Sequence, residues 1–233
     1  MILNILPLLN RFPLQSIFTL LSFSTSLVIA ITVHEFSHAF AATMQGDNTA
    51  RRKGRLSLNP TAHLDPVGTL LILIAGFGWG KPTPVNPNSL RLGTLFGMSL
   101  VAFAGPISNI MVASLFATIM NLGFSNPVPY SFALFYQSGT DIMTYMFFQI
   151  VFWNLALATF NLLPIAPLDG FKIVLGLLPH QLAFRFAMLE QYGPGILLSV
   201  IMLDFLFSVG ILSWFIYPVL NVLIKLLLGA QVL

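Results

Sequence analysis

The chain has 233 residues, of which 57% are hydrophobic and only 7% are charged. Soluble proteins of ordinary composition carry about 25% charged residues, so this composition argues against a soluble domain and predicts an integral membrane protein. The net charge is +3, from ten basic and seven acidic residues, and the basic residues are spread over an apolar chain, which favours no nucleic-acid partner. The absence of cysteine excludes disulfides and thiolate metal sites.

Several apolar stretches are long enough to cross a bilayer as helices, which takes about 18 or more residues. The chain contains four to five of them, so the predicted fold class is an all-α polytopic membrane protein. The predicted spans cover residues 14–43, 94–122, 141–163 and 193–228, the last of which is divided into two by a break at 208–210. No repeat, linker or low-complexity segment is present, so residues 1–233 are predicted to form one membrane-embedded domain.

Two segments fit no span. Residues 67–77 are apolar but too short to cross a bilayer, and the sequence GWGKPTPVNPN follows them with glycines and prolines that interrupt a helix. We predict a re-entrant or interfacial β-hairpin over about residues 67–92. Residues 179–192 mix Arg185 and Glu190 with leucines and aromatic residues, which is typical of an amphipathic helix at the membrane interface.

The basic residues indicate how the chain is oriented, because lysine and arginine are enriched in cytoplasmic loops. If the last two spans cross the membrane out and back, nine of the ten basic residues share one side, which is predicted to be cytoplasmic, and Arg11 lies opposite. The nine residues are Arg51, Arg52, Lys53, Arg55, Lys81, Arg91, Lys172, Arg185 and Lys225. The loop between residues 122 and 141 has no positive charge and is predicted to be external.

The first predicted span contains the sequence HEFSH at residues 34–38. His34 and His38 are four residues apart, so a helix places them on one face, where both can bind one metal ion. Glu35 can lie beside that ion without binding it. The H-E-x-x-H pattern is typical of zinc metalloproteases, in which the glutamate is the general base. Ionisable residues inside a membrane cost free energy and are functional candidates by default, so a merely structural role is not favoured.

A catalytic zinc ion usually has a third protein ligand. The extended pattern with a third histidine is excluded because Met44 occupies its position. Asp169 is the preferred carboxylate, because two prolines interrupt the helix before it and Gly170 permits a turn. The alternative is that Asp169 only caps the following segment. Asp204, inside an apolar stretch, has no patterned neighbour.

Three motifs, in this order, resemble those of the site-2 protease family of intramembrane zinc metalloproteases. They are HEFSH at residues 34–38, AGPISN at 104–109 and NLLPIAPLDG at 161–170. The sequences GRLSLNPTAHLDPVG at 54–68 and GWGKPTPVNP resemble the bacterial and archaeal branch of the family. The resemblance covers the catalytic core, and the chain resembles a minimal form without appended domains.

This resemblance implies one zinc ion per chain, bound by His34, His38 and Asp169, with Glu35 as the catalytic base. It implies hydrolysis of peptide bonds of transmembrane proteins within or next to the bilayer, as in regulated intramembrane proteolysis. The expected partners are transmembrane protein substrates and the lipid bilayer of a prokaryotic cell membrane. Two alternatives are a zinc transporter, whose H-E-x-P-H-E pattern the chain lacks, and a catalytically silent scaffold, which would have lost a base or a ligand.

Three further residues are candidates for the site. The resemblance places Asn161 near the substrate carbonyl or its strand and gives Asn109 a role in packing and polar support. An amide in a dry site can also stabilise a developing oxyanion, so both asparagines are candidates for substrate binding. The alternative for Asn109 is a purely structural contact between close-packed helices. His63 is predicted either to support the metal site or to hydrogen-bond a turn as an ordinary loop histidine.

Overall fold

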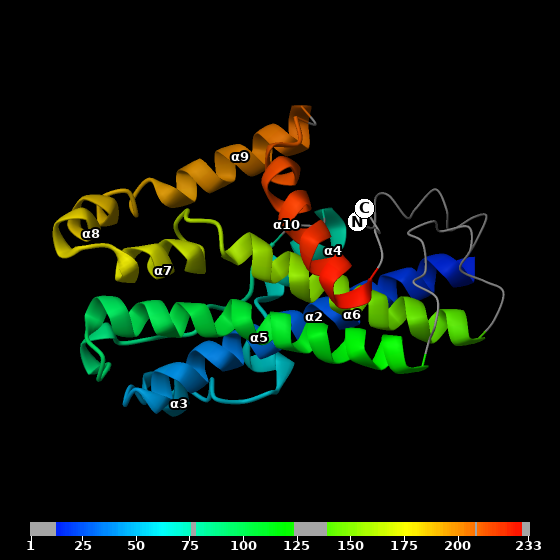
Figure 1. The fold of residues 1–233 in the computed structure, drawn as a ribbon, viewed down its shortest axis with the longest axis horizontal. Coiled ribbons are helices and arrows are strands. Elements are labelled where there is room, and N and C mark those ends of the chain that lie inside the picture. Colours follow the sequence, from blue (N-terminus) through cyan, green and yellow to red (C-terminus); the bar gives the residue numbers. More distant parts are fainter. Residues whose placement is uncertain (1–12, 76–77, 124–138, 208, 230–233) are drawn as a thin grey trace.

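The computed structural model describes residues 13–75, 78–123, 139–207 and 209–229. This described part is helical and contains no strand. Three long helices, each packed against the other two, lie lengthwise side by side at the centre of the fold (Figure 1). They are α2 (Pro13–Met44), α5 (Thr94–Gly123) and α6 (Gly139–Asn161).

Four helices of the described residues are long and apolar enough to cross a membrane: Pro13–Met44, Thr94–Gly123, Ile142–Asn161 and α10 (Ile211–Leu228). The prediction of an all-α polytopic membrane protein is therefore confirmed. Helices suit this environment because they satisfy their backbone hydrogen bonds within one segment. Hydroxyl groups within them bond backward along the helix, as Ser26 Oγ does by donating to Ser22 O at 2.7 Å.

The predicted β-hairpin at residues 67–92 is wrong for the part of this range that the structure describes, which excludes residues 76–77. Its apolar half forms the helix α4 (Pro66–Ala75). Proline suits the first helical position, and Asp65 Oδ1 caps the helix by accepting a hydrogen bond from Gly68 N at 2.8 Å. The other half contains prolines that cannot donate to a sheet. Among the described residues, the one isolated bridge joins Gly80 to Leu64, which lies just before this range.

The predicted helix interruption before Asp169 is confirmed. Helix α6 ends at Asn161, and α7 (Asp169–Leu177) begins at the aspartate itself. A Cβ atom on Gly170 would overlap the main-chain carbonyl group of Leu162, so glycine allows a close approach of the two segments. Helix α7 also packs against α5, where Ser99 Oγ donates to Ile173 O at 3.2 Å. These contacts bring Asp169 towards the central helices.

The last predicted stretch forms one short and one long helix. Helix α9 (Gly193–Phe207) has 15 residues and ends at the predicted break, while α10 begins at Ile211. The two oxygens of Asp204 accept hydrogen bonds from Ile211 N at 2.7 Å and from Leu212 N at 2.8 Å. Asp204 therefore satisfies donors at the start of α10, which explains an aspartate that no sequence pattern accounted for.

Helix α10 ends at the opposite end of the bundle from Arg91. Asn121, near the end of α5, donates through Nδ2 to Leu227 O at 2.9 Å. Arg91 lies just before the first turn of α5, at the other end of that helix. The prediction that nine basic residues share one side is therefore wrong for Lys225. The reason is that α10 ends beside the end of α5, so α9 and α10 together do not return the chain to the end that carries Arg91.

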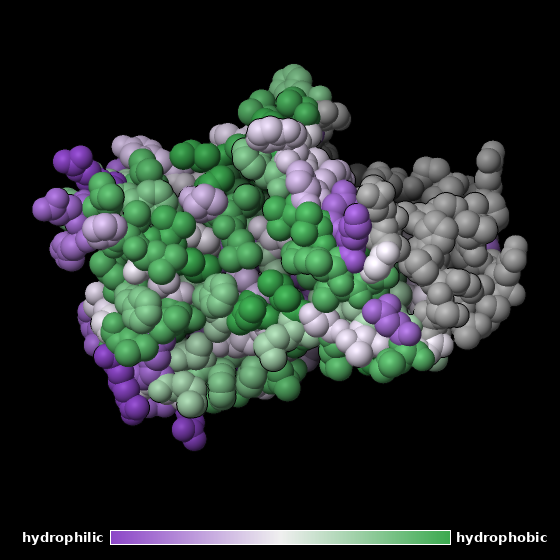
Figure 2. All heavy atoms as spheres, in the orientation of Figure 1, coloured by the Kyte–Doolittle hydropathy of each residue, from purple (hydrophilic) through white to green (hydrophobic). Residues whose placement is uncertain are grey.

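Helices α3 (Thr49–Arg52) and α8 (His180–Ala187), which carry Arg51, Arg52 and Arg185, lie at one end of the bundle, which we call the basic end (Figure 1). Lys53 and Arg55 follow α3 directly and bond back to it through their N–H groups. Figure 2 shows hydrophilic residues gathered over α3 and α8, while apolar residues cover the middle of the molecule. Helix α8 itself was predicted as amphipathic. It buries Ala183 and exposes Leu182 and Phe184. The basic end is thus the expected cytoplasmic end.

Single cysteine substitutions test this arrangement, because the chain contains no cysteine. We expect a membrane-impermeant maleimide to label Gly123→Cys and Lys225→Cys in intact cells, and to label Arg52→Cys only after the membrane is opened. The physical reason is that positively charged loops remain in the cytoplasm. Labelling of Lys225→Cys and Arg52→Cys from the same side would contradict the position of α10.

Candidate metal centre

Three side chains that are far apart in the sequence converge in the interior. His34 and His38 lie on one face of α2, and Asp169 lies at the start of α7. Asp169 Oδ2 is 3.0 Å from His34 Nε2 and 3.2 Å from His38 Nε2. All three residues are buried, and their potential ligand atoms lie within 4.8 Å of one another.

A buried amide fixes the orientation of the His34 ring. Asn109 on α5 donates through Nδ2 to Ala30 O and to Asn154 Oδ1, both at 2.9 Å. These two bonds use its donors, so Asn109 Oδ1 must accept the hydrogen bond from His34 Nδ1 at 2.7 Å. His34 therefore carries its proton on Nδ1 and directs the lone pair of Nε2 towards Asp169.

His38 is oriented in the same manner by the backbone of α5. Its Nδ1 lies 2.7 Å from Val101 O, which can only accept, so the proton is again on Nδ1. Gly105 lies against both rings, because a Cβ atom there would be 2.5 Å from His38 Cε1 and 2.6 Å from His34 Cε1. Any larger residue would displace the imidazoles, so the glycine of AGPISN is needed for helix α5 to pack here.

The chemistry of this donor set fits a metal ion. Asp169 Oδ2 is buried and has no hydrogen-bond donor among the described residues. With the histidine protons on Nδ1, two nitrogen lone pairs and a carboxylate oxygen face one another at close range, which is unfavourable without a cation. A proton on one imidazole could bridge only one of the two contacts with Asp169. A divalent metal ion would satisfy all three atoms.

Glu35 lies outside the group of three ligands, as the sequence pattern predicts for a base. Its half-buried side chain accepts a hydrogen bond at Oε2 from Thr83 N at 2.8 Å. Its main-chain oxygen accepts a second bond from Thr83 Oγ1 at 3.0 Å. The carboxylate is therefore held by an extended segment from outside the helix that carries it.

The other three candidates differ in their surroundings. Asn161 lies at the end of α6, where its Nδ2 donates to Leu157 O at 3.0 Å. Asn109 is completely buried and has used its donors on protein acceptors, so its contacts favour support of His34 over substrate binding. His63 is buried too, but its Nε2 lies 2.7 Å from Ser57 O and it does not belong to the ligand group.

Sequence reasoning missed two residues of this site. Asn154 on α6 accepts from Asn109 and donates to Ile150 O at 2.8 Å, which extends the polar contacts to the third central helix. The sequence could have indicated Asn154, because it is an amide in an apolar span, two helical turns before Asn161. Thr83 had no local signal, since its contact with Glu35 joins residues 48 positions apart.

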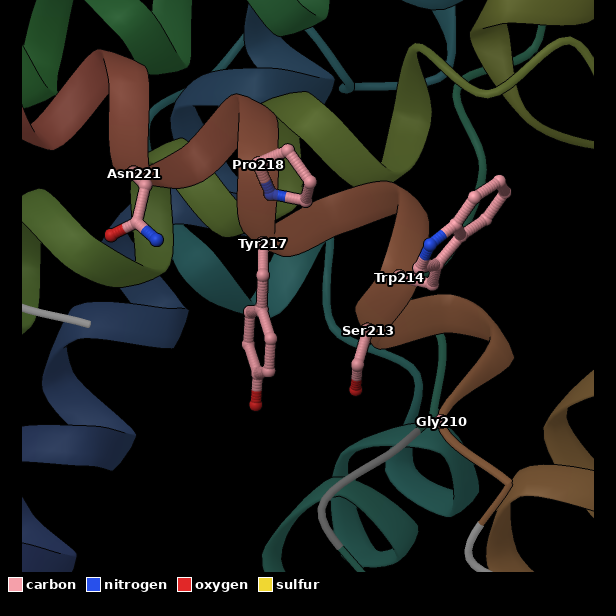
Figure 3. A pocket seen from close by; sticks show the side chains of 6 residues that line it. All are labelled: Gly210, Ser213, Trp214, Tyr217, Pro218 and Asn221. Atoms are coloured by element: carbon pink, nitrogen blue, oxygen red, sulfur yellow. The ribbon is translucent and has the colours of Figure 1, made fainter.

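The centre does not coincide with the hollows on the surface. One of these lies beside α10, where Ser213, Tyr217 and Asn221 point from the helix to the same side (Figure 3). Another lies at residues 187–191. Neither is lined by a candidate ligand. The candidate centre is instead enclosed between α2, α5 and α7.

Comparison with known proteins supports this reading of the site. Residues 22–201 match the sequence model of peptidase family M50. The matched region includes all three candidate ligands, Glu35 and both candidate asparagines. The resemblance to site-2 proteases is therefore confirmed by a match that covers more than half of the chain.

Curated relatives give the same result. YwhC of Bacillus subtilis, a candidate zinc metalloprotease, is 38% identical over 196 residues, which is 84% of each chain. Rip2 of Mycolicibacterium smegmatis, also a candidate zinc metalloprotease, is 28% identical over 71% of this chain and 61% of its own. Rip2 of Mycobacterium tuberculosis is 30% identical over 66% of this chain and 54% of its own. The chain thus spans most of YwhC but less than two thirds of the Rip2 proteins. No solved structure gives a significant match.

Removal of the remote ligand should remove the metal. We expect Asp169→Ala, purified in detergent, to contain much less than one zinc ion per chain by elemental mass spectrometry, because two imidazoles alone cannot complete the site. Asp204→Asn is the matched control and should retain zinc, since Asp204 caps α10. Zinc that persists in Asp169→Ala but disappears from Asp204→Asn would make Asp204 the third ligand.

Loss of the amide that orients His34 should weaken zinc binding without abolishing it. We expect Asn109→Ala to reduce zinc affinity by about 10- to 100-fold, measured by competition with a chelator, because such supporting contacts commonly have this effect. Asn121→Ala removes an amide from the far end of the same helix, where it bonds Leu227 O, and should leave the affinity unchanged. Equal affinities for wild type and Asn109→Ala would show that the amide does not support the ligand.

Proposed function

The chain belongs to peptidase family M50, and from this membership we propose that it hydrolyses peptide bonds of transmembrane proteins within or next to the membrane. The observation that carries the proposal is the buried group of His34, His38 and Asp169, with Glu35 beside it on a helix able to span the bilayer. The centre is enclosed between apolar helices, so the proposed substrates are chains that lie in the membrane beside it. The substrate class that matches this location is a membrane-spanning protein.

Zinc, when bound by the two imidazoles and Asp169, would lower the pKa of a water molecule and polarise the scissile carbonyl group. Glu35 accepts a proton from the attacking water molecule while the water oxygen bonds to the carbonyl carbon. The same carboxyl group then gives the proton to the amide nitrogen as the C–N bond breaks. The Nδ1 contacts with Asn109 and Val101 keep both imidazoles in the tautomer that binds a metal.

The substrate must be unwound, because a helix uses its carbonyl groups in its own hydrogen bonds. The extended chain of residues 80–86, which contacts Glu35 through Thr83, is the proposed edge along which an unwound segment pairs. Two of these residues are prolines, and the N–H groups of Lys81, Thr83 and Asn86 already bond within the protein. Pairing would therefore use mainly N–H groups of the substrate and carbonyl groups of this edge.

The remaining assignments complete the proposal. Asn161 retains an amide hydrogen beyond its bond to Leu157 O and is the proposed donor to the substrate carbonyl or its strand. Asn109 positions His34, and His63 organises the loop that carries residues 57–64. The protein would act in a prokaryotic cell membrane in regulated intramembrane proteolysis, with the basic end in the cytoplasm.

Replacement of the proposed base tests the reaction. We expect Glu35→Gln to reduce turnover of a transmembrane substrate in detergent by at least about 100-fold, because an amide cannot accept the water proton. Its zinc content should remain near wild type, since Glu35 is not a ligand. The matched control is Glu190→Gln, which changes the only other glutamate, exposed at residue 190, and should retain full turnover.

The same pair of variants can identify substrates. Peptide fragments that mass spectrometry detects in membranes with Glu190→Gln, and that disappear with Glu35→Gln, are products of this protein. Turnover by Glu35→Gln near the wild-type rate would exclude Glu35 as the base.

A further inference from the structure

The carboxylate of Glu35 receives a main-chain hydrogen bond that the sequence pattern does not require. Thr83 N donates to Glu35 Oε2 at 2.8 Å, and Thr83 Oγ1 donates to Glu35 O at 3.0 Å. The hydrogen bonds of the described residues thus engage Oε2 and leave Oε1 without a donor. The two oxygens of the proposed base are therefore not equivalent.

The sequence around Thr83 prepares its N–H group for this contact. Thr83 stands between Pro82 and Pro84, so it provides the only N–H group of the three residues. A residue that precedes proline is restricted to extended conformations. The N–H group is therefore presented from a stiff segment, and ordering it costs little conformational entropy.

This segment is fixed at both ends. On one side Lys81 N donates to His63 O at 2.7 Å, and on the other side Asn86 N donates to Asp47 Oδ2 at 2.7 Å. Burial by itself would raise the pKa of Asp47, but hydrogen bonds from Thr49 and Asn86 hold this pKa below its usual value. The second anchor therefore keeps its charge. Thr83 lies between the two anchors and cannot easily move away from Glu35.

We propose that Thr83 is a positioning residue, whose N–H group holds Oε2 of Glu35 so that Oε1 faces the water molecule and accepts its proton. This inference rests on the proposed function of Glu35 as the base. Holding one oxygen limits rotation of the carboxylate, so the other stays within reach of the proton to be transferred. A hydrogen-bond donor also makes a carboxylate a weaker base. Loss of the bond should therefore lower kcat if positioning dominates, and raise kcat if the weakening of the base dominates.

Proline substitution removes the N–H group, together with the hydroxyl group that bonds Glu35 O, and the direction of the change in kcat separates the two effects. We expect Thr83→Pro to lower kcat by about 10- to 100-fold, the usual effect of a hydrogen bond to a charged group, with KM and zinc content unchanged. Thr83→Ser keeps both donors and should retain wild-type kcat. Thr83→Val is the matched control, since it keeps the N–H group and removes only the hydroxyl bond to Glu35 O, and it should lose clearly less kcat than Thr83→Pro. An unchanged or increased kcat in Thr83→Pro, or an equal loss in Thr83→Val, would overturn the proposal.

An infrared measurement tests the contact without relying on turnover. The chain has only two glutamates, so ¹³C-glutamate labelling in a Glu190→Gln background leaves Glu35 as the single labelled carboxylate. We expect the carboxylate stretching band to shift in Thr83→Pro and to stay in place in Thr83→Ser and Thr83→Val, in zinc-free protein as well as with zinc. An unmoved band in Thr83→Pro would overturn the assignment even if the protein is an active protease. Conversely, full activity of Glu35→Gln would remove the proposed function whatever the band does.

A second variant covers the case in which Thr83→Pro does not accumulate in the membrane. Replacing Pro82 and Pro84 together by alanine keeps the N–H group of Thr83 but loosens the segment that presents it. We expect a lower kcat, a broadened Glu35 band and unchanged zinc content. Wild-type kcat and band shape in this variant would overturn the proposal.

Discussion

The contact of Asp169 Oδ2 with the Nε2 atoms of His34 and His38, at 3.0 and 3.2 Å, is the interaction on which the surrounding structure depends. Three electron-pair donors this close in an apolar interior repel one another, and a metal ion bound between them would remove this repulsion. The fold brings them together by placing the first residue of α7 against α2, a helix long and apolar enough to span a membrane. The break between α6 and α7 places the carboxylate there, and Gly170 allows that break to close tightly.

Keeping two imidazoles in the metal-binding tautomer requires acceptors at both Nδ1 atoms, and α5 provides both. Val101 O serves His38, and the amide of Asn109 serves His34 while it also bonds Ala30 O and Asn154 Oδ1. The polar contacts therefore run through all three central helices. Buried amides are costly when unpaired, so each satisfied bond also fixes how these helices pack.

The side of the centre that is proposed to face a substrate is held by a segment without regular secondary structure. Residues 80–86 form neither a helix nor a sheet, and because two of them are prolines, the segment has few N–H groups. Those N–H groups bond to His63 O, to Glu35 and to Asp47, so the segment is stiff although it has no regular secondary structure. One face of α2 thus carries the two candidate histidine ligands, while the neighbouring carboxylate of Glu35 is hydrogen-bonded by this extended segment.

The sequence by itself determined the features that depend on short-range physics. Hydropathy identified the four long spans, helical spacing placed His34 and His38 on one face, and prolines marked the break before Asp169. It misjudged α4, because ten apolar residues suit a strand or a helix and the cap by Asp65 was overlooked. Only the tertiary structure decided that Lys225 lies away from the basic end, that Asn109 supports His34 and that Thr83 holds Glu35. These outcomes join residues about 50 to 100 positions apart, and they depend on which helices pack together, which no local pattern encodes.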